Sequence, residues 1–509
     1  MSKRIIKLFL LSLIVLTSCS REDSNDKKTI VIPENQKTPL TPTQINAKID
    51  ESINSKGTFN WRDADSYLIW SAVVNGNNIV TIGFGNSKTN FERAKTSNNA
   101  KIQNELLAII MKYEETTLDK VLISADSDLN LIDVLISKQE TIIALRQSKY
   151  IRYIEPADYR YMDVRNAQKS PSVGTNSNAG TSSGCGYDAE TLATADYTTT
   201  TPNAKVPWTF TQHNIPSAWS LSTGAGITIG IIDTGVSPSQ SLLGANFNNG
   251  LSSGRTIQKN GVYVDSIWPW STTTDGVNDL CGHGTSMAST AAAPRNDKGL
   301  PVGVAYNANL VTYRAAYNVV IDGYQEQEAV KKAFTALGNN TKVKIISMSM
   351  GWIFSVGKIE DAIKLAYGKG KLIFCAAGTS TSFTTFVGVI FPAWMPETVA
   401  VTGVKEGSSY QACDDCHTGS KVDFTVVMQR ASSGNTVPVA SYYENQTDYI
   451  GGSSVATATT AGIAALVWSK NPTWTRDQVL TKMRQSASLY PNKNAEYGYG
   501  NVNAFLAVQ

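Results

Sequence analysis

The sequence is poor in the features of a nucleic-acid-binding protein or of a disulfide-rich scaffold. Lysine and arginine number 45 against 42 acidic residues, so the net charge is only 45 − 42 = +3, and no long basic block occurs. A balance this close to neutral disfavours nucleic acid as a partner. Cysteine occurs six times in 509 residues, and no internal repeat is present. Hydrophobic residues at 42% and charged residues at 17% are ordinary for a globular protein.

Long apolar runs are lacking everywhere except at the start, so we predict no membrane-spanning segment after it. Lys3, Arg4 and Lys7 precede an apolar stretch over residues 8–16, which is typical of a secretory signal peptide. The following Leu-Thr-Ser-Cys resembles the bacterial lipoprotein box, which implies cleavage before Cys19 and lipidation of its thiol. We therefore expect an exported lipoprotein of a bacterial cell envelope, held in the outer membrane. An ordinary signal peptide with a chance cysteine is the alternative.

An odd number of cysteines remains beyond Cys19, so at least one thiol is free or pairs outside the chain. The remaining cysteines are Cys185, Cys281, Cys375, Cys413 and Cys416. Cys375 lies in an apolar run and is expected to be a small buried hydrophobe. Cys413 and Cys416 precede His417 in a pattern that also matches haem attachment or half of a zinc site. We favour a local disulfide between Cys413 and Cys416, or bridges from this pair to the two cysteines nearer the start.

Composition divides the rest of the chain into segments. After a signal peptide over residues 1–18, residues 19–45 are expected to form a lipidated tether or stalk, rich in Pro and Thr toward its end. Alternating helical and β-rich runs over residues 46–165 indicate a small α+β domain. Residues 166–205 are rich in small and polar residues, and exposed linkers of this kind are where proteases cut. Residues 206–509 form a larger domain.

Local patterns predict the elements of the small domain. We expect a β-hairpin of residues 67–74 and 79–83, because the Asn-Gly-Asn-Asn between them is a turn signal. Residues 105–111 have the length and composition of a helix, and a second helical stretch is expected around residues 131–137. A strand over residues 150–156 closes the domain.

The larger domain shows a different pattern, in which apolar strands alternate with amphipathic helices. These segments are residues 227–232, 310–314, 326–337, 343–349, 359–366, 372–377 and 398–404. Nearly continuous apolar strands separated by helices indicate an α/β fold with a parallel sheet covered on both faces. In such sheets the active site forms beyond the carboxyl ends of the strands.

Three short segments of the larger domain carry candidate catalytic residues. Asp233 ends an apolar strand and is followed by Thr-Gly, His283 stands between two glycines, and Ser454 opens a helix made of small residues. A serine hydroxyl becomes a nucleophile when an imidazole takes its proton, and the imidazole needs a buried carboxylate to orient it. The amino end of the helix at Ser454 supplies N–H groups for a developing oxyanion. These residue types together predict a catalytic triad.

Each of these residues also has a simpler interpretation. Asp233 could belong to a turn or to an aspartic-protease motif, but no second copy of that motif exists. Ser454 could be only a helix cap, and Ser453 is an alternative nucleophile that the spacing of the following small residues disfavours. His213 lies in a linker-like stretch before the larger domain and is expected at the surface.

These segments resemble the Asp, His and Ser boxes of the subtilase family, in that family's order. They lie 283 − 233 = 50 and 454 − 283 = 171 residues apart. Flanking matches at residues 206–208, 215–219, 302–305 and 498–504 extend the resemblance to the end of the chain. The resemblance implies a subtilisin-like three-layer fold with a mostly parallel sheet. It also implies a serine endopeptidase that cleaves polypeptides through an acyl-enzyme and requires no cofactor.

The same resemblance implies a substrate groove. Ser349, Met350 and Gly351 match the strand that pairs with the peptide and walls the primary pocket. Arg314 and Ala315 match the strand on the opposite side. A substrate held between two strands gains affinity from main-chain hydrogen bonds and specificity from side-chain pockets.

The chain departs from the family at two places. Where subtilases usually have an Asn that donates to the oxyanion, this chain has Thr379, which we expect to form the oxyanion hole with Ser454. Because a threonine hydroxyl is shorter, a donor there could be lost, at a cost of about 100- to 1000-fold in rate. A catalytically impaired subtilase that acts as a surface binding protein is therefore the alternative function. The second departure is a missing proline four residues after Ser454.

Residues 121–159 resemble the end of a subtilase propeptide. We therefore expect residues 46–165 to act as an intramolecular chaperone and inhibitor, with processing in residues 166–205. The resemblance also allows a structural calcium ion near Asn296 and Asp297, although a surface turn is the simpler interpretation of that pair.

Overall fold

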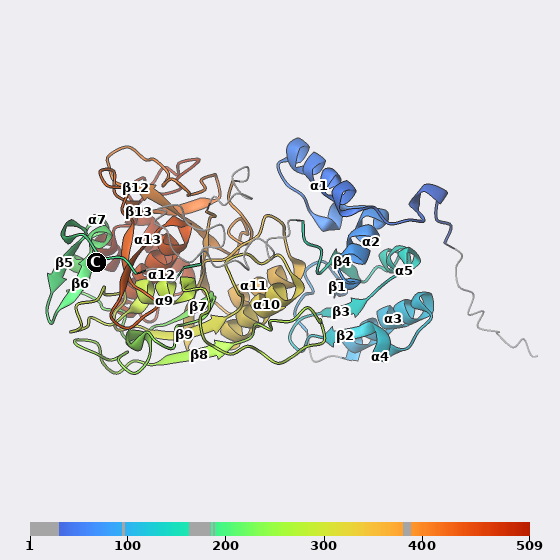
Figure 1. Cartoon of the computed structure of the whole chain (residues 1–509), viewed down its shortest axis with the longest axis horizontal. Helices are drawn as coiled ribbons and strands as arrows, with labels where there is room; N and C mark the ends of the chain where they lie inside the picture. Colours follow the sequence, from blue (N-terminus) through green and yellow to red (C-terminus); the bar gives the residue numbers. More distant parts are fainter. Residues whose placement is uncertain (1–29, 94–96, 162–184, 187–188, 380–387) are drawn as a thin grey trace, which may run out of the picture.

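The structure, a computed structural model, describes residues 30–93, 97–161, 185–186, 189–379 and 388–509. A small N-terminal unit lies beside a larger α/β unit (Figure 1). The predicted signal peptide, the lipidation site Cys19 and most of the linker's first half lie outside the described residues.

The N-terminal unit is a four-stranded antiparallel sheet with helices. Its elements are α1 (Pro42–Lys56), α2 (Ser66–Asn75), β1 (Ile79–Phe84), α3 (Ser97–Glu114), α4 (Leu118–Val121), β2 (Leu122–Ala125), β3 (Leu131–Leu135), α5 (Gln139–Arg146) and β4 (Ile151–Pro156). The strand order is β2-β3-β1-β4. A capping box at Thr41 and Gln44 begins α1, four residues before the predicted start of the domain. The helix expected near residues 105–111 lies inside α3.

The predicted hairpin of residues 67–74 and 79–83 is wrong in its first arm, which is helix α2. Asp65 explains the difference, because its side chain accepts the Leu68 N–H at 2.8 Å and caps the helix. The Asn-rich turn ends this helix rather than joining two strands. Asn77 and Asn78 both have positive φ, and the Asn78 N–H donates to the Val73 carbonyl.

The helix expected around residues 131–137 is also wrong, because residues 131–135 form strand β3. This strand lies between β1 and β2, and both pairings are antiparallel. The apolar run is shorter than two helical turns, so a periodic helical face cannot be distinguished from a buried strand by pattern alone.

The larger unit is built around a seven-stranded sheet in the order β13-β12-β11-β10-β7-β9-β8. Its strands are β7 (Thr228–Asp233), β8 (Ile257–Gly261), β9 (Asn309–Arg314), β10 (Val343–Met348), β11 (Leu372–Ala376), β12 (Val399–Lys405) and β13 (Val422–Gln429). All neighbouring strands pair in parallel. The α/β architecture with a parallel central sheet expected from the sequence is confirmed.

Helices cover both faces of this sheet. They are α9 (His283–Ala292), α10 (Tyr324–Asn339), α11 (Gly357–Gly368), α12 (Gly452–Lys470) and α13 (Arg476–Gln485). Side chains of each strand alternate between the faces. Thus Leu372 and Phe374 pack in the cluster that contains α9 and α12, whereas Ile373 and Cys375 pack in the cluster that contains α10 and α11.

The N-terminal unit rests on α10 and α11, which lie between it and the large sheet (Figure 1). The contact buries charges. Lys358 of α11 is fully buried and pairs with Asp133 of β3 at 2.9 Å. Arg152 of β4 donates to Asp361 of α11 at 2.9 Å. Beside these ion pairs, the Phe354 ring meets aromatic rings of the N-terminal unit at centroid distances of 5.3–5.5 Å.

The end of the predicted linker belongs structurally to the larger unit. Strands β5 (Tyr197–Thr200) and β6 (Ala204–Pro207) form a hairpin, and Lys205 exchanges backbone hydrogen bonds with Leu300 and Val302. The short helices that follow are α7 (Trp208–Gln212) and α8 (Ile215–Ala218). A further hairpin, β14 (Val437–Ala440) and β15 (Thr447–Ile450), precedes α12, and α14 (Ala504–Val508) closes the chain.

The prediction that His213 lies at the surface is wrong. Its side chain is fully buried. Its Nδ1 lies 2.7 Å from the Val502 carbonyl, and its Nε2 accepts the Val427 N–H at 2.9 Å. This arrangement requires the neutral ring, and burial lowers the pKa of His213 to about 4. His213 therefore ties the first helices of the larger unit to β13 and to the chain's end.

Candidate active site

Asp233 ends β7 in the middle of the large sheet, at the edge where the carboxyl ends of the strands meet. Its side chain is 1% exposed, and Oδ1 accepts the Thr234 N–H at 2.8 Å. The Asp233 carbonyl accepts the Ala315 N–H of the neighbouring strand's end at 2.8 Å. Oδ2 is also buried, and none of the described residues donates to it. Asp233 is therefore a firmly held, buried acceptor.

His283 is the first residue of α9 and faces this carboxylate. Its Nδ1 lies 2.7 Å from Asp233 Oδ1, so Nδ1 carries the proton and Nε2 is left as the acceptor of the neutral ring. Glycines make the approach possible. Gly282 has a φ of 89°, and a Cβ at Gly284 would lie 2.4 Å from the Gly235 carbonyl oxygen. The first turn of α9 is thus pressed against the turn that follows β7.

The electrostatics of this pair favour a basic imidazole. Burial alone would lower the pKa of His283, but the charge of Asp233, its hydrogen bond and a smaller effect of Asp279 raise the pKa above the ordinary 6.5. An imidazole held this way can accept a proton and be stabilised as imidazolium, which is the behaviour of a general base.

Ser454 lies in the first turn of α12. Its Oγ donates to the Ser349 carbonyl at 3.4 Å, and the Ser349 hydroxyl donates back to the Ser454 carbonyl at 3.1 Å. Among the described residues the Ser454 hydroxyl has no hydrogen bond to His283. The first turns of α9 and α12 nevertheless lie together, because Met287 packs with Val455 and Ala458 in one cluster.

The oxyanion candidates surround the same helix start. Gly451, the N-cap of α12, provides no side-chain cap, and in its place the Thr379 hydroxyl accepts the Ser453 N–H at 3.2 Å. Ser453 Oγ in turn accepts the Gly378 N–H at 3.1 Å. The Ser454 N–H belongs to the first turn, whose N–H groups have no partner within the helix. Thr379 thus lies beside the predicted oxyanion hole, with its hydroxyl engaged at the helix start.

The predicted groove residues on the β10 side lie next to Ser454. Met350 is buried, and Gly351 pairs with the chain around residue 320. The Gly351 N–H donates to the Val319 carbonyl at 3.1 Å, and its carbonyl accepts the Ile321 N–H at 3.3 Å. Gly351 is therefore hydrogen-bonded to residues 319–321, which follow the other predicted side of the groove in the chain.

The two predicted groove residues at the end of β9, Arg314 and Ala315, lie inside the protein. Arg314 is 1% exposed, and its guanidinium pairs with Asp275 at 2.5 Å and donates to the Asn278 carbonyl. Its own carbonyl accepts N–H groups of the chain after β8. Ala315 is fully buried, with its N–H on Asp233. In this structure Arg314 supports the loop before α9, and neither side chain is open to a substrate.

Comparison with known proteins agrees with this geometry. The subtilase family (peptidase S8) matches residues 224–500, more than half of the chain. The chain belongs to the subtilase family. It is 30% identical to subtilisin E of Bacillus subtilis over 312 residues, which cover 60% of this chain and 71% of that protein. It is 27% identical to M-protease of Shouchella clausii over 315 residues, 62% of this chain and 73% of that protein.

A solved structure extends the likeness of the fold beyond the family region. Fervidolysin of Fervidobacterium pennivorans, described as a keratinolytic enzyme related to subtilisin, matches with a TM-score of 0.57 and 16% identity. The match covers 85% of this subtilase and 61% of that chain. By family, the protein is a subtilisin-like serine endopeptidase.

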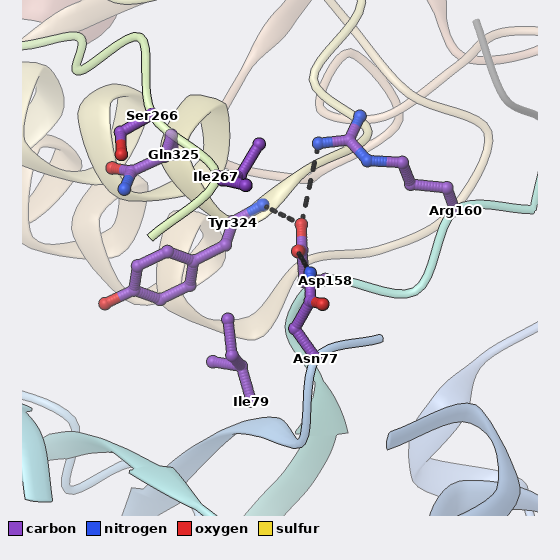
Figure 2. Close-up of a pocket in the computed structure, with 8 residues that line it drawn as sticks. All are labelled: Asn77, Ile79, Asp158, Arg160, Ser266, Ile267, Tyr324 and Gln325. Atoms are coloured by element: carbon purple, nitrogen blue, oxygen red, sulfur yellow. Dashed lines mark hydrogen bonds and ion pairs between the residues drawn. The ribbon is translucent and has the colours of Figure 1, made fainter. Parts of the chain in front are cut away.

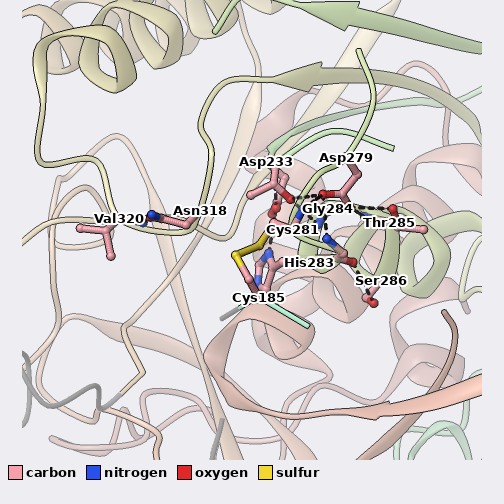
Figure 3. Close-up of a disulfide and its surroundings, with 12 residues drawn as sticks. Cys185, Asp233, Asp279, Cys281, His283, Gly284, Thr285, Ser286, Asn318 and Val320 are labelled. Atoms are coloured by element: carbon pink, nitrogen blue, oxygen red, sulfur yellow. Dashed lines mark hydrogen bonds and ion pairs between the residues drawn. A yellow bond between two sulfur atoms is a disulfide. The ribbon is translucent and has the colours of Figure 1, made fainter. Parts of the chain in front are cut away.

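Two disulfides flank the site of this subtilase. Cys185 is bonded to Cys281, two residues before His283, and the Gly186 N–H donates to the Cys281 carbonyl at 2.9 Å (Figure 3). Cys413 is bonded to Cys416, which pairs with Thr379 in an isolated β-bridge. Both sulfurs of the Cys-x-x-Cys-His pattern are therefore engaged, which leaves no thiol for haem or zinc.

The remaining candidates near the site have local roles. Cys375 is a free thiol buried in β11, and burial raises its pKa. Asn296 is fully buried, and its side-chain oxygen accepts the Lys298 and Leu300 N–H groups. Asp297 pairs with Lys298. The Asn296 side-chain oxygen is therefore used within its own turn. The described residues contain no group of three or more His, Cys, Asp or Glu side chains placed to hold a metal ion.

Asp279, a fully buried carboxylate four residues before His283, was not predicted from the sequence. A signal was present, because an acidic residue just before a helix start often satisfies its free N–H groups.

None of the described helices combines the length and apolarity needed to cross a bilayer.

Proposed function

We propose that this subtilase hydrolyses peptide bonds with Ser454 as nucleophile, His283 as general base and Asp233 as the residue that orients the imidazole. The observation that carries the proposal is the 2.7 Å contact between His283 Nδ1 and Asp233 Oδ1, which leaves Nε2 free to take a proton. For attack, the Ser454 hydroxyl must leave the Ser349 carbonyl and turn toward His283. Its proton passes to Nε2, and Oγ bonds to the scissile carbonyl carbon.

The tetrahedral intermediate then collapses as the imidazolium gives its proton to the leaving amine, which forms the acyl-enzyme on Ser454. Water, deprotonated by His283, releases the acid product in the second half of the reaction. In our proposal the Ser454 N–H and the amino end of α12 stabilise the oxyanion, and Thr379 contributes either its hydroxyl or only the placement of the helix start. Ser349, Met350 and Gly351 would line the groove once the pairing at Gly351 opens.

We also propose that the N-terminal unit is an inhibitory propeptide and that the chain is a zymogen. Carboxylates of this unit supply N–H acceptors at both helices on which it rests. Glu155 accepts the Gly357 N–H at the start of α11 at 2.7 Å, and Asp158 accepts the Tyr324 N–H at the start of α10 at 3.0 Å. Figure 2 shows Asp158 between Asn77, Arg160 and Tyr324 in a small pocket at this junction, about 100 Å³ in volume.

Export and anchoring complete the proposal. The basic and apolar start of the sequence and the box before Cys19 support secretion as a lipoprotein of the cell envelope. Within the proposed processing segment of residues 166–205, cleavage before Cys185 would separate the larger unit from this anchor, because Cys185 is bonded to Cys281. Polypeptides would be the substrates, and the N-terminal unit would be the internal partner.

A fluorophosphonate probe tests the nucleophile. We expect the processed enzyme to be labelled, the label to disappear in Ser454→Ala, and the label to persist in the neighbouring control Ser453→Ala. Absence of labelling in the processed wild-type enzyme would support the alternative, a catalytically impaired surface binding protein. That alternative is motivated by Thr379, so Thr379→Asn should raise kcat if a donor is missing there.

Expression of Ser454→Ala alone tests self-processing, because we expect no mature fragment from it.

A further inference from the structure

The carboxylate of Asp279 accepts five hydrogen bonds although its side chain is fully buried. Oδ1 accepts the Thr234 hydroxyl at 2.9 Å and the N–H groups of Cys281 and Gly282 at 2.9 and 2.8 Å. Oδ2 accepts the N–H and the hydroxyl of Thr285 at 2.9 and 2.6 Å. Figure 3 shows Asp279, the Cys185–Cys281 disulfide and His283 grouped around the turn that precedes α9.

These bonds join the two turns that carry Asp233 and His283. The Thr234 hydroxyl follows Asp233 and also accepts the Gly284 N–H at 2.9 Å. The Thr285 hydroxyl follows His283 by two residues and also accepts the Ser237 N–H at 2.9 Å. Each hydroxyl therefore accepts a hydrogen bond from a backbone N–H of the opposite turn and donates its own hydrogen bond to Asp279. The network ends at this one carboxylate.

We propose that Asp279 is a positioning residue for the peptidase reaction, because its carboxylate holds the first turn of α9 against the turn after β7 and so keeps His283 in register with Asp233. The inference rests on the proposed function of this pair. Gly282, the N-cap of α9, has no capping side chain. Asp279 and Thr234 together take the N–H groups of the N-cap and first turn that the helix itself leaves without partners.

A carboxylate is needed here rather than an amide. Both oxygens of Asp279 face donors only, so an Asn would direct its NH₂ at either the Thr285 donors or the three donors on the other side. The charge also matters to the imidazole, which is faced by Asp233 from β7 and by Asp279 from its own loop. Burial first, and then the charge of Asp279 among other groups, raise the pKa of Tyr442, and the nearby Arg314 charge is paired with Asp275.

The covalent bond at Cys281 adds a constraint on the same turn. The Cys281 N–H is one of the donors to Asp279, and its sulfur is bonded to Cys185. His283 therefore follows a turn that is held from one side by a disulfide and from the other by a carboxylate. A positional error of about 1 Å can reduce a rate on the order of 100-fold, so this support is large enough to matter.

Asp279→Asn in the full chain tests the inference, and Asp423→Asn is the matched control. Asp423 is a largely buried carboxylate of the same domain that pairs with Arg484, away from this site. In the Ser454→Ala background, NMR titration of the histidines should show a lower pKa for His283 in Asp279→Asn and no change in Asp423→Asn. In processed enzyme, Asp279→Asn should lower kcat about 10- to 100-fold with KM within about twofold. The acid limb of kcat/KM should move to lower pH.

An unchanged His283 pKa or an unchanged kcat in folded Asp279→Asn would overturn the inference, since a purely structural residue would change only the melting temperature. If Asp279→Asn does not fold, Thr285→Val and Thr285→Ser decide the question. The valine removes the hydrogen bond from the residue 285 hydroxyl to Asp279 and should lower kcat. The serine keeps this hydrogen bond and should keep the wild-type kcat. Equal rates in the two variants would contradict the proposal. The NMR result is independent of activity, so it still decides the role of Asp279 if the fluorophosphonate test shows that the enzyme is inactive.

Discussion

The two faces of the large sheet are covered in different ways. On the face of α9 and α12 the cover is apolar and rich in alanine, and Gly462 allows α12 to approach the chain at Val304. On the other face, α11 carries buried charged side chains that pair with the N-terminal unit: Lys358 pairs with Asp133, and Asp361 pairs with Arg152. If the N-terminal unit is released as proposed, a face of ion pairs suits that release, because the exposed charges can be hydrated, whereas a newly exposed apolar face would remain in contact with water.

Of the changes considered for the two faces, loss of one buried charge should reduce stability the most. Lys358→Met leaves Asp133 and Glu328 without their shared cation, and breaking a buried pair typically costs about 3–5 kcal/mol. We expect the transition of the N-terminal unit to move to lower urea in full-length Ser454→Ala, with the transition of the larger unit unchanged.

The matched control is Lys332→Met on the neighbouring helix α10. Lys332 is 46% exposed and lies 3.6 Å from Glu328, and exposed pairs of this kind contribute about 1 kcal/mol or less. Equal shifts for Lys358→Met and Lys332→Met would contradict the importance of buried charge at this interface.

Acid should weaken the larger unit through His213. Because burial lowers the pKa of His213 from 6.5 to about 4, its neutral form contributes stability that is fully present above pH 6.5 and is lost as the pH falls toward 4. The shift corresponds to roughly 3 kcal/mol. Urea unfolding of the larger unit between pH 7 and 4 measures it, and His213→Gln should flatten the pH dependence. If His213→Gln lost stability in acid as much as the wild type does, groups other than His213 would be the cause of the acid sensitivity.

A smaller effect is expected from a single methyl group on the apolar face. A Cβ at Gly462 would lie 2.5 Å from the Val304 Cβ, so Gly462→Ala should destabilise the larger unit by about 1–3 kcal/mol. Gly368→Ala at the exposed end of α11 meets nothing within 4 Å and should be neutral or slightly stabilising. Calorimetry of both variants would show similar melting temperatures if packing on this face were loose.

The sequence predicts the larger unit better than the smaller one, for a physical reason. Parallel strands buried on both faces read as long apolar runs, so the order of strands and helices around Asp233 is correct. In the small domain, a short run such as residues 131–135 fits either element, and the cap at Asp65 outweighs the turn signal after it.

The support around the site was less predictable than its chemical groups. Residue type alone suggested Asp233, His283 and Ser454. The hydrogen bonds of Asp279, the buried state of Arg314 and the contact of Thr379 with Ser453 depend on segments that are distant in the chain. No local pattern contains that information.

The bond between Cys185 and Cys281 has a consequence for maturation. Any cut on the amino-terminal side of Cys185 creates a new chain end that stays attached near His283. The residues just after it are held as well, because Glu190 exchanges hydrogen bonds with Thr447 and the Ala193 N–H donates to the Tyr449 hydroxyl. Release of the N-terminal unit would therefore leave the new amino-terminal segment in place, because that segment is bonded covalently to the turn just before His283.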